Sequence, residues 1–299
     1  MGAQGCYPTG VEADRVKRAG LRVQVGKLAG VILLALNVSL YARQGSVVRL
    51  DEILQRLQQN LDTYDQSIPS FFCNEHLDSM VEQIGARGSS APNYETIAES
   101  IFRLKREDPT GKAQEMTESR EVIQLNGKPP RPGEGEDLNA PYMFTGAFSG
   151  GLSVVSLEQK ECMRYTLERP RVGKPYVVRF TTAPAAERTE RCILQEDGSG
   201  FVEVDPASMQ ITHLELRAPH HAIRPQGFGG GRFKNNDGTW FIAVDYAPVV
   251  LDQRTFWLPK RIVSRTAMKW TRWTFDATYR NYHKLEVTTR ILPADGNAP

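Results

Sequence analysis

Residues able to carry out chemistry are concentrated in one short segment. Cys73, Glu75, His76 and Asp78 offer a thiol, an imidazole and two carboxylates close together in the sequence. A thiol becomes a nucleophile when a neighbouring base generates the thiolate, which requires contact in space. Neighbouring side chains of an extended strand point to opposite faces, so Glu75 should point away from His76. We therefore predict no catalytic group here and expect Cys73 to be buried as a small hydrophobic residue.

Three further sets of residues resemble ligand sites but lack the required arrangement. His213, His220 and His221 have imidazoles that can bind metals, yet adjacent histidines point apart in an extended segment. The cysteines fit no zinc-site spacing. The glycine-rich segment 227–231 follows no strand, which favours a loop over a phosphate-binding turn. No hydrolase, metalloprotease or nucleotide-binding motif is present. We predict a non-enzymatic protein with no metal site and no cofactor.

Aromatic side chains are denser in the last third of the chain than elsewhere. They could form an ordinary sheet core or line an apolar ligand cavity. The neighbouring bases Lys260, Arg261, Arg265, Lys269 and Arg272 would then meet anionic headgroups or form a solvated face. The residues that we expect to line such a cavity are Trp240, Ile242, Tyr246, Trp257, Trp273, Phe275 and Tyr279.

The first element that must position these residues is a helix. Apolar residues recur at i, i+3, i+4 and i+7 over residues 50–64. Asp51 and Glu52 suit the positive end of the helix dipole, and Pro69 disfavours helical backbone at Ile68. We expect this helix to act as a plug or lid over an apolar surface. The face that it would bury contains Leu50, Ile53, Leu54, Leu57 and Leu61.

After the helix, apolar and polar residues mostly alternate with a period of two. Residues 93–106 fit either a strand or a short helix, and Asn126-Gly127 predicts a tight hairpin turn. The pattern predicts a mainly β (α+β) fold, a curved antiparallel sheet or half-barrel with an N-terminal helix as plug or lid. The clearest strands cover 71–84, 118–125, 176–182, 201–205, 210–218, 239–250, 255–265, 272–282 and 284–292.

The N-terminus predicts export to the periplasm or the extracellular space. Basic residues precede an apolar run over 28–42, which is the order of a secretory signal peptide. The run is shorter than the ~20 residues that span a bilayer. We expect cleavage after Ala42, leaving 1–42 as N-terminal extension and signal peptide and 43–299 as a single domain. The alternatives are a buried helix and an uncleaved membrane anchor.

The net charge limits the class of partner, and the cysteines predict a disulfide. The formal net charge of the whole chain is +2, which argues against nucleic acid as a partner. Three of the four cysteines follow Ala42, and in an oxidising compartment they would form one pair with one thiol left over. We favour a bond between Cys162 and Cys192, which lie in strand-like segments. We expect a monomer.

Several segments resemble a known group of secreted proteins. They are ESREVIQLNGKP, TGAFSGGL, GSGFVEVDPASMQITHLELRA, VDYAPVVLDQRTFWLPKRI and FDATYRNYHKLEVTTRIL, which follow one another along the chain. The group is abundant in acidobacteria and is similar in architecture to the LolA-like and RseB-like half-barrels. The resemblance implies a curved sheet whose apolar concave face is plugged by helices. It supplies no catalytic motif.

These observations favour a binding protein for a lipid, a lipoprotein acyl chain or another amphiphile. Each CH₂ moved from water into an apolar cavity contributes about 0.8 kcal/mol, so a chain of ~14 carbons could supply ~11 kcal/mol before entropic costs. One alternative is an RseB-like envelope sensor or interaction module with an envelope protein partner. Others are a structural envelope protein without ligand, and a hydrolase, which would need clustered polar groups with shifted pKa values.

Overall fold

The helix and strands follow the periodicity of the sequence. The computed structural model describes residues 48–83, 94–106, 116–132, 148, 154–220, 238–269 and 271–286. Its elements are α2 (Leu50–Ser67), β1 (Phe71–Gln83), β2 (Tyr94–Arg106), β3 (Met116–Leu125), the short 3₁₀ turn η3 (Leu157–Gln159), β4 (Met163–Leu167), β5 (Tyr176–Thr182), the 3₁₀ turn η4 (Ala185–Glu187), β6 (Ser199–Val204), β7 (Ile211–His220), β8 (Gly238–Leu251), β9 (Arg254–Ala267) and β10 (Thr271–Lys284).

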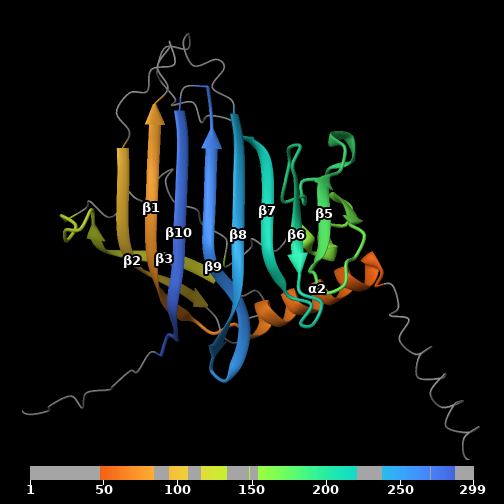
Figure 1. Ribbon diagram of the computed structural model, residues 1–299, viewed down its shortest axis with the longest axis horizontal. Coiled ribbons are helices and arrows are strands. Elements are labelled where there is room, and N and C mark those ends of the chain that lie inside the picture. The colour runs from red at the N-terminus through yellow and green to blue at the C-terminus, as the bar shows by residue number, and fades with distance from the viewer. Residues whose placement is uncertain are drawn as a thin grey trace, which may run out of the picture. The chain divides into compact units, whose positions relative to one another are not determined.

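All ten strands belong to one open antiparallel sheet (Figure 1). The strand order is β3-β2-β1-β10-β9-β8-β7-β6-β5-β4, so the first strand pairs with the last in the middle of the sheet. The predicted fold class is therefore confirmed: the described residues form a mainly β fold with one N-terminal helix. Residues 94–106, whose pattern fitted two structures, form strand β2.

An apolar row crosses the whole sheet on one face, which we call the inner face. The register aligns one residue from each strand, and only the two on the edge strands are partly exposed. Burying each such side chain contributes on the order of 1.5–3 kcal/mol for a Val or Leu. The row contains Leu125, Ala98, Leu77, Ala277, Ile262, Val244, Leu214, Val202, Val178 and Leu167.

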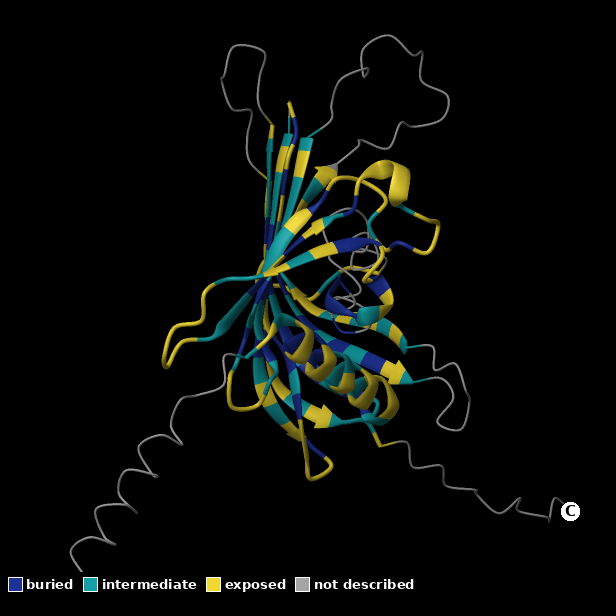
Figure 2. Cartoon of the chain, turned by 90° about the vertical axis from the view of Figure 1, so that its right-hand side faces the viewer, coloured by how far each residue is buried: buried dark blue, intermediate teal, exposed yellow. Residues whose placement is uncertain are grey.

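Helix α2 lies inside the curve of the sheet with its exposed face turned away from the strands (Figure 2). Ile53, Leu54 and Leu57 are buried in the hydrophobic core. At the C-terminal end, Arg106 donates hydrogen bonds to the carbonyl oxygens of Asp65 (2.5 Å) and Gln66 (3.2 Å). These bonds satisfy carbonyl groups that the last turn of a helix leaves without intrahelical partners. Packing and capping together hold the helix on the sheet.

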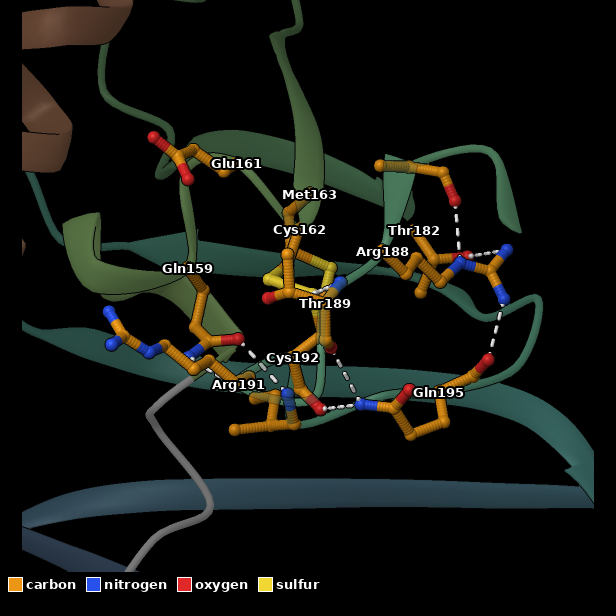
Figure 3. The surroundings of a disulfide bond; sticks show 12 residues. Gln159, Glu161, Cys162, Met163, Thr182, Arg188, Thr189, Arg191, Cys192 and Gln195 are labelled. Carbon is orange, nitrogen blue, oxygen red and sulfur yellow. Dashed lines mark hydrogen bonds between the residues drawn. A yellow bond between two sulfur atoms is a disulfide. The ribbon is translucent and has the colours of Figure 1, made fainter. Parts of the chain in front are cut away.

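The disulfide lies between strand ends and not within strands (Figure 3). Cys162 immediately precedes β4, Cys192 follows η4, and their sulfur atoms lie 2.10 Å apart. The strand prediction is confirmed for the residues that follow Cys162, which form β4. It was wrong for the segment around Cys192, because side-chain contacts shape this loop. Arg188 donates to the carbonyl oxygens of Ala183 (2.6 Å) and Gln195 (2.8 Å). The pair that the sequence favours is therefore bonded, in a loop that the sequence misassigned.

The Asn126-Gly127 signal marks a real turn but a very short hairpin. Both residues have positive φ, 49° and 76°, as a type I′ turn requires. Only Leu125 and Lys128 pair across it. The Asn126 side-chain oxygen instead accepts a hydrogen bond from the backbone N–H of Ile97 on β2, at 2.8 Å. The turn thus fastens the end of β3 to its neighbour.

Candidate functional site

A pocket of about 550 Å³ opens between the C-terminal half of α2 and the first residues of β7 and β9. We call it the α2 pocket. Its floor is formed by Leu57, Ile211 and Phe256, which are buried members of the core. Polar residues gather toward solvent, so the pocket has an apolar floor and a polar rim. The remaining lining residues are Asn60, Leu61, Thr63, Tyr64, Gln66, Ser67, Gln210, Arg254, Thr255 and Trp257.

The rim of the α2 pocket continues into a second hollow of about 570 Å³ at the β8–β9 turn. Ser67, Arg254 and Phe256 line both. The turn residues Asp252 and Gln253 have φ of 50° and 64°, a conformation that costs a non-glycine residue about 1–2 kcal/mol. Such strained backbone is concentrated at functional sites.

The predicted cavity residues fall into two groups. Trp257 lines the α2 pocket, whereas the other six lie on β8 and β10. The register places Trp240 and Trp273 on either side of Thr266 of β9. It likewise places Ile242 and Phe275 on either side of Ser264, whose hydroxyl accepts a hydrogen bond from the Trp240 indole N–H at 2.9 Å.

Large side chains of β8 and β10 therefore lie on either side of small hydroxyl residues of β9. We call this surface the inner wall. Of the six, Ile242, Tyr246, Phe275 and Tyr279 are buried in the core, and Trp240 and Trp273 are partly exposed. Among the lid residues, Leu50 is partly buried and Leu61 lines the α2 pocket.

Most of the basic residues near the aromatic set lie away from this wall. Arg261 forms a two-pronged ion pair with Asp276, with distances of 2.9 and 2.5 Å. Arg265 lies over the Phe241 ring, 5.9 Å from its centroid, and Arg272 approaches Glu82 at 3.9 Å. Exposed pairs of this kind contribute about 0–1 kcal/mol each. These arginines belong to a solvated face and are not arranged around a headgroup.

Sequence reasoning missed a buried ion pair in the interior. The Nε of Arg120 on β3 lies 2.9 Å from both carboxylate oxygens of Glu75 on β1, and the Tyr279 hydroxyl donates to the same carboxylate at 2.7 Å. Glu75 is 0% exposed and the Arg120 side chain 4%. The sequence did contain a signal for this pair: on each of the two alternating strands, a charged residue occupies a position on the inner face, where an apolar residue is expected. Glu75, for example, lies between Cys73 and Leu77 on that face.

The surroundings of the ion pair oppose nucleophilic chemistry. Burial first, and then the charge of Glu75, raise the pKa of the Cys73 thiol far above its ordinary value. The thiol therefore stays protonated and weakly reactive. His76 points to the other face, as predicted, where its Nδ1 lies 2.6 Å from the Glu99 carboxylate. The segment thus separates the thiol from the imidazole.

Tyrosines extend the polar cluster toward the α2 pocket. The Tyr64 hydroxyl, on α2, donates to the carbonyl oxygen of Phe148 at 2.7 Å. Burial raises the pKa of Tyr64, and the neighbouring Tyr246 adds to that effect. The Tyr246 hydroxyl is buried and has no hydrogen-bond partner among the described residues. A cluster with shifted pKa values is present, but every tyrosine shift favours the neutral phenol.

The histidine-rich region holds no metal cluster in the part of the chain that the structure describes. His213 is flanked by Asp245, 2.7 Å from its Nδ1, and by Glu215, 3.4 Å from its Nε2. His221 and the glycine-rich segment 227–231 lie outside the described residues, as does the side chain of His220. Within the described ranges, no helix is both long and apolar enough to cross a bilayer.

The fold alone defines the class of this protein: the described residues form an open antiparallel sheet with one helix on its inner face. No protein-family model matches the chain, and no curated protein matches it. Among the solved structures that match is a "putative outer membrane lipoprotein-sorting protein domain" of Vibrio parahaemolyticus, at 10% identity and a TM-score of 0.32. The match covers 77% of this chain and 90% of that one. At this identity and TM-score, the similarity says nothing about a ligand.

Proposed function

We propose that the protein is a non-enzymatic carrier that binds a lipid, a lipoprotein acyl chain or another amphiphile. The observation that supports this most directly is the floor of the α2 pocket. Leu57, Ile211 and Phe256 belong to the core, so an acyl chain inserted there would extend that core. At about 0.8 kcal/mol per CH₂, a few buried methylene groups suffice for measurable affinity.

The buried polar groups support binding over catalysis. Cys73 and the tyrosines are kept in their neutral forms, and Glu75 is engaged by Arg120 and Tyr279. A nucleophile or general base needs a pKa tuned toward the working pH. The pKa values of the Cys73 thiol and of these tyrosines are shifted the other way.

The disulfide supports the proposed location. Bonds such as Cys162–Cys192 persist in oxidising compartments and are rare in reducing ones. We place the protein in the periplasm or outside the cell, as a monomer whose 43–299 domain remains after residues 1–42 are removed. Its partner would be a lipid or a lipoprotein of the envelope and not a nucleic acid.

The proposal is tested by exporting the full chain to a bacterial periplasm and purifying it without detergent. Native mass spectra should show a bound species at near-unit occupancy, and an organic extract should identify a lipid. The same spectra should give a chain that begins at Arg43. A protein that is free of ligand, and that also takes up no fluorescent fatty acid, would overturn the proposal.

A pocket-filling variant sharpens the test. Leu61→Trp places an indole in the α2 pocket and should weaken fatty-acid uptake at least tenfold. The matched control is Ile123→Trp on edge strand β3, an exposed position away from the pocket lining, which should bind normally. Equal binding by both variants, with intact circular dichroism, would exclude the pocket as the site.

We propose the inner wall as a second, separate contact for an apolar ligand. Trp273 is partly exposed beside Phe275 on this wall, so Trp273→Ala removes apolar contact area and should weaken lipid binding. Unchanged binding with an intact fold would count against this contact.

A further inference from the structure

Arg254 occupies a distinctive place at the rim of the α2 pocket. It is the first residue of β9, it is exposed, and it lines both adjoining hollows. Among the described residues that line the α2 pocket it is the only charged one. Arg254 is therefore the one formal charge in the described lining of this pocket.

No acidic side chain of the described residues neutralises this guanidinium. The acid closest in sequence is Asp252, whose carboxylate lies 3.0 Å from the Lys284 ammonium group. On the helix side, the hydroxyl groups of Thr63 and Ser67 donate to backbone carbonyls of α2. The N–H groups of Arg254 thus remain available to a ligand.

The strand geometry places the charge beside an apolar surface. Arg254 and Phe256 are two residues apart on β9, so their side chains leave the same face of the strand, about 6–7 Å apart. Phe256 belongs to the buried floor and Arg254 to the exposed rim. This order from floor to rim matches a ligand whose tail and headgroup have opposite polarity.

The backbone of Arg254 is fixed before any ligand arrives. Leu251, which is buried, pairs with Arg254 and closes the tight Asp252–Gln253 turn. Binding therefore has to order the side chain of Arg254 but not its backbone. Guanidinium groups bind carboxylate or phosphate oxygens through two parallel hydrogen bonds.

We propose that the α2 pocket selects amphiphiles with an anionic headgroup, a carboxylate or a phosphate, which Arg254 binds at the rim while the tail lies against Phe256 and Leu57. The inference rests on the proposed function, because it assigns the headgroup chemistry of the same site. It implies that neutral amphiphiles of equal chain length bind more weakly.

The experiment compares four ligands with the same twelve-carbon chain below their micelle concentrations. Dodecanoate and dodecyl phosphate are anionic, dodecanol is neutral and dodecyltrimethylammonium is cationic. Each displaces a fluorescent fatty acid from the mature protein. We expect the anions to bind at least tenfold more tightly than dodecanol, and the cation to bind more weakly still. Raising the salt concentration should reduce this preference.

Variants assign the preference to one side chain. Arg254→Gln should abolish the tenfold difference between the anions and dodecanol, whereas Arg254→Lys should retain part of it. The matched control is Arg280→Gln, an exposed arginine of β10 outside the pocket lining, which should behave as the unmodified protein. Tighter binding of the phosphate would favour a phospholipid as the source, and tighter binding of the carboxylate would favour a free fatty acid.

The two proposals fail in different ways. If the protein binds none of the four ligands, the proposed function is wrong. If it binds all four equally, or if Arg254→Gln keeps the preference for anions, the carrier remains supported and the headgroup inference is overturned.

Discussion

Arg120 and Arg254 occupy opposite kinds of site in the same molecule. Arg120 is sealed in the interior, bound to Glu75 and placed over the Phe102 ring, 5.0 Å from its centroid. Arg254 is exposed at the rim of a pocket, with no acidic partner among the described residues. A buried charge that has its partner contributes to specific packing. A charge without a partner beside an apolar hollow is available for recognition.

The environment of Arg120 shows how the sealed site is stabilised. Burial alone would lower the pKa of its guanidinium, but the charge of Glu75 and the neighbouring Tyr279 outweigh burial and raise it. The guanidinium therefore stays charged throughout the range in which the protein folds. Removing either member of the pair leaves an uncompensated charge in an apolar interior.

The largest expected effect follows from breaking the sealed pair. Arg120→Met should lower the free energy of unfolding by about 3–5 kcal/mol, because Glu75 is left buried and unpaired. The double variant Glu75→Gln/Arg120→Met should lose less, since no buried charge remains. Urea unfolding followed by circular dichroism measures both. If Arg120→Met alone lowers the free energy of unfolding by less than about 1 kcal/mol, water reaches this site.

A second prediction uses Cys73 as a probe of the same region. Its thiol is buried and burial raises its pKa, so iodoacetamide at pH 8 should modify it at least ~100-fold more slowly in the folded protein than in guanidinium chloride. With the Cys162–Cys192 bond intact, it is the only thiol after residue 42. Peptide mass spectrometry over time gives the rate. Modification as fast as in the unfolded chain would mean that the interior is open.

The third prediction concerns the strained turn that precedes Arg254. Gln253 has a φ of 64°, which glycine adopts without steric strain. Gln253→Gly should therefore raise the free energy of unfolding by up to about 1 kcal/mol. Thermal unfolding measures the change, and ligand affinity should stay the same because Arg254 keeps its position. A lower melting temperature would show that the Gln253 side chain contributes contacts of its own.

The smallest expected effect completes the comparison of the two arginines. Arg254→Gln should change the free energy of unfolding by no more than about 0.5 kcal/mol, as exposed substitutions usually do. The same urea experiment as for Arg120→Met provides the measurement. A loss close to that of Arg120→Met would make Arg254 a structural residue and remove the contrast.

The elements that rest on local patterns were predictable from the sequence. The alternation of Leu214 and Leu216 with polar residues gave strand β7, and the apolar spacing of Ile53, Leu54 and Leu57 gave α2. Period and turn chemistry are encoded within a few residues. The loop that contains Cys192 was misassigned because a disulfide to a residue 30 positions away and the side chain of Arg188 shape it, and the alternation of residue types reveals neither contact.

The candidate site was less predictable because it combines distant segments. Glu75 and Arg120 lie on β1 and β3, with β2 between them, and only the register shows that they meet. Arg254 reads in the sequence as an ordinary hairpin residue. Its place beside α2 depends on tertiary packing that brings residues near position 60 against residues near position 255. Of the predicted cavity residues, only Trp257 lines that pocket.

The pairing of β1 with β10 also governs when the fold can form. Glu75 and Tyr279, which meet across these strands, are 204 positions apart in the chain. Closing so long a loop costs entropy before any contact is gained, and such distant pairings make folding slow. The centre of the sheet cannot close until β10 has been synthesised. Strands β1–β3 therefore cannot join the rest of the sheet until nearly all of the described chain has been made.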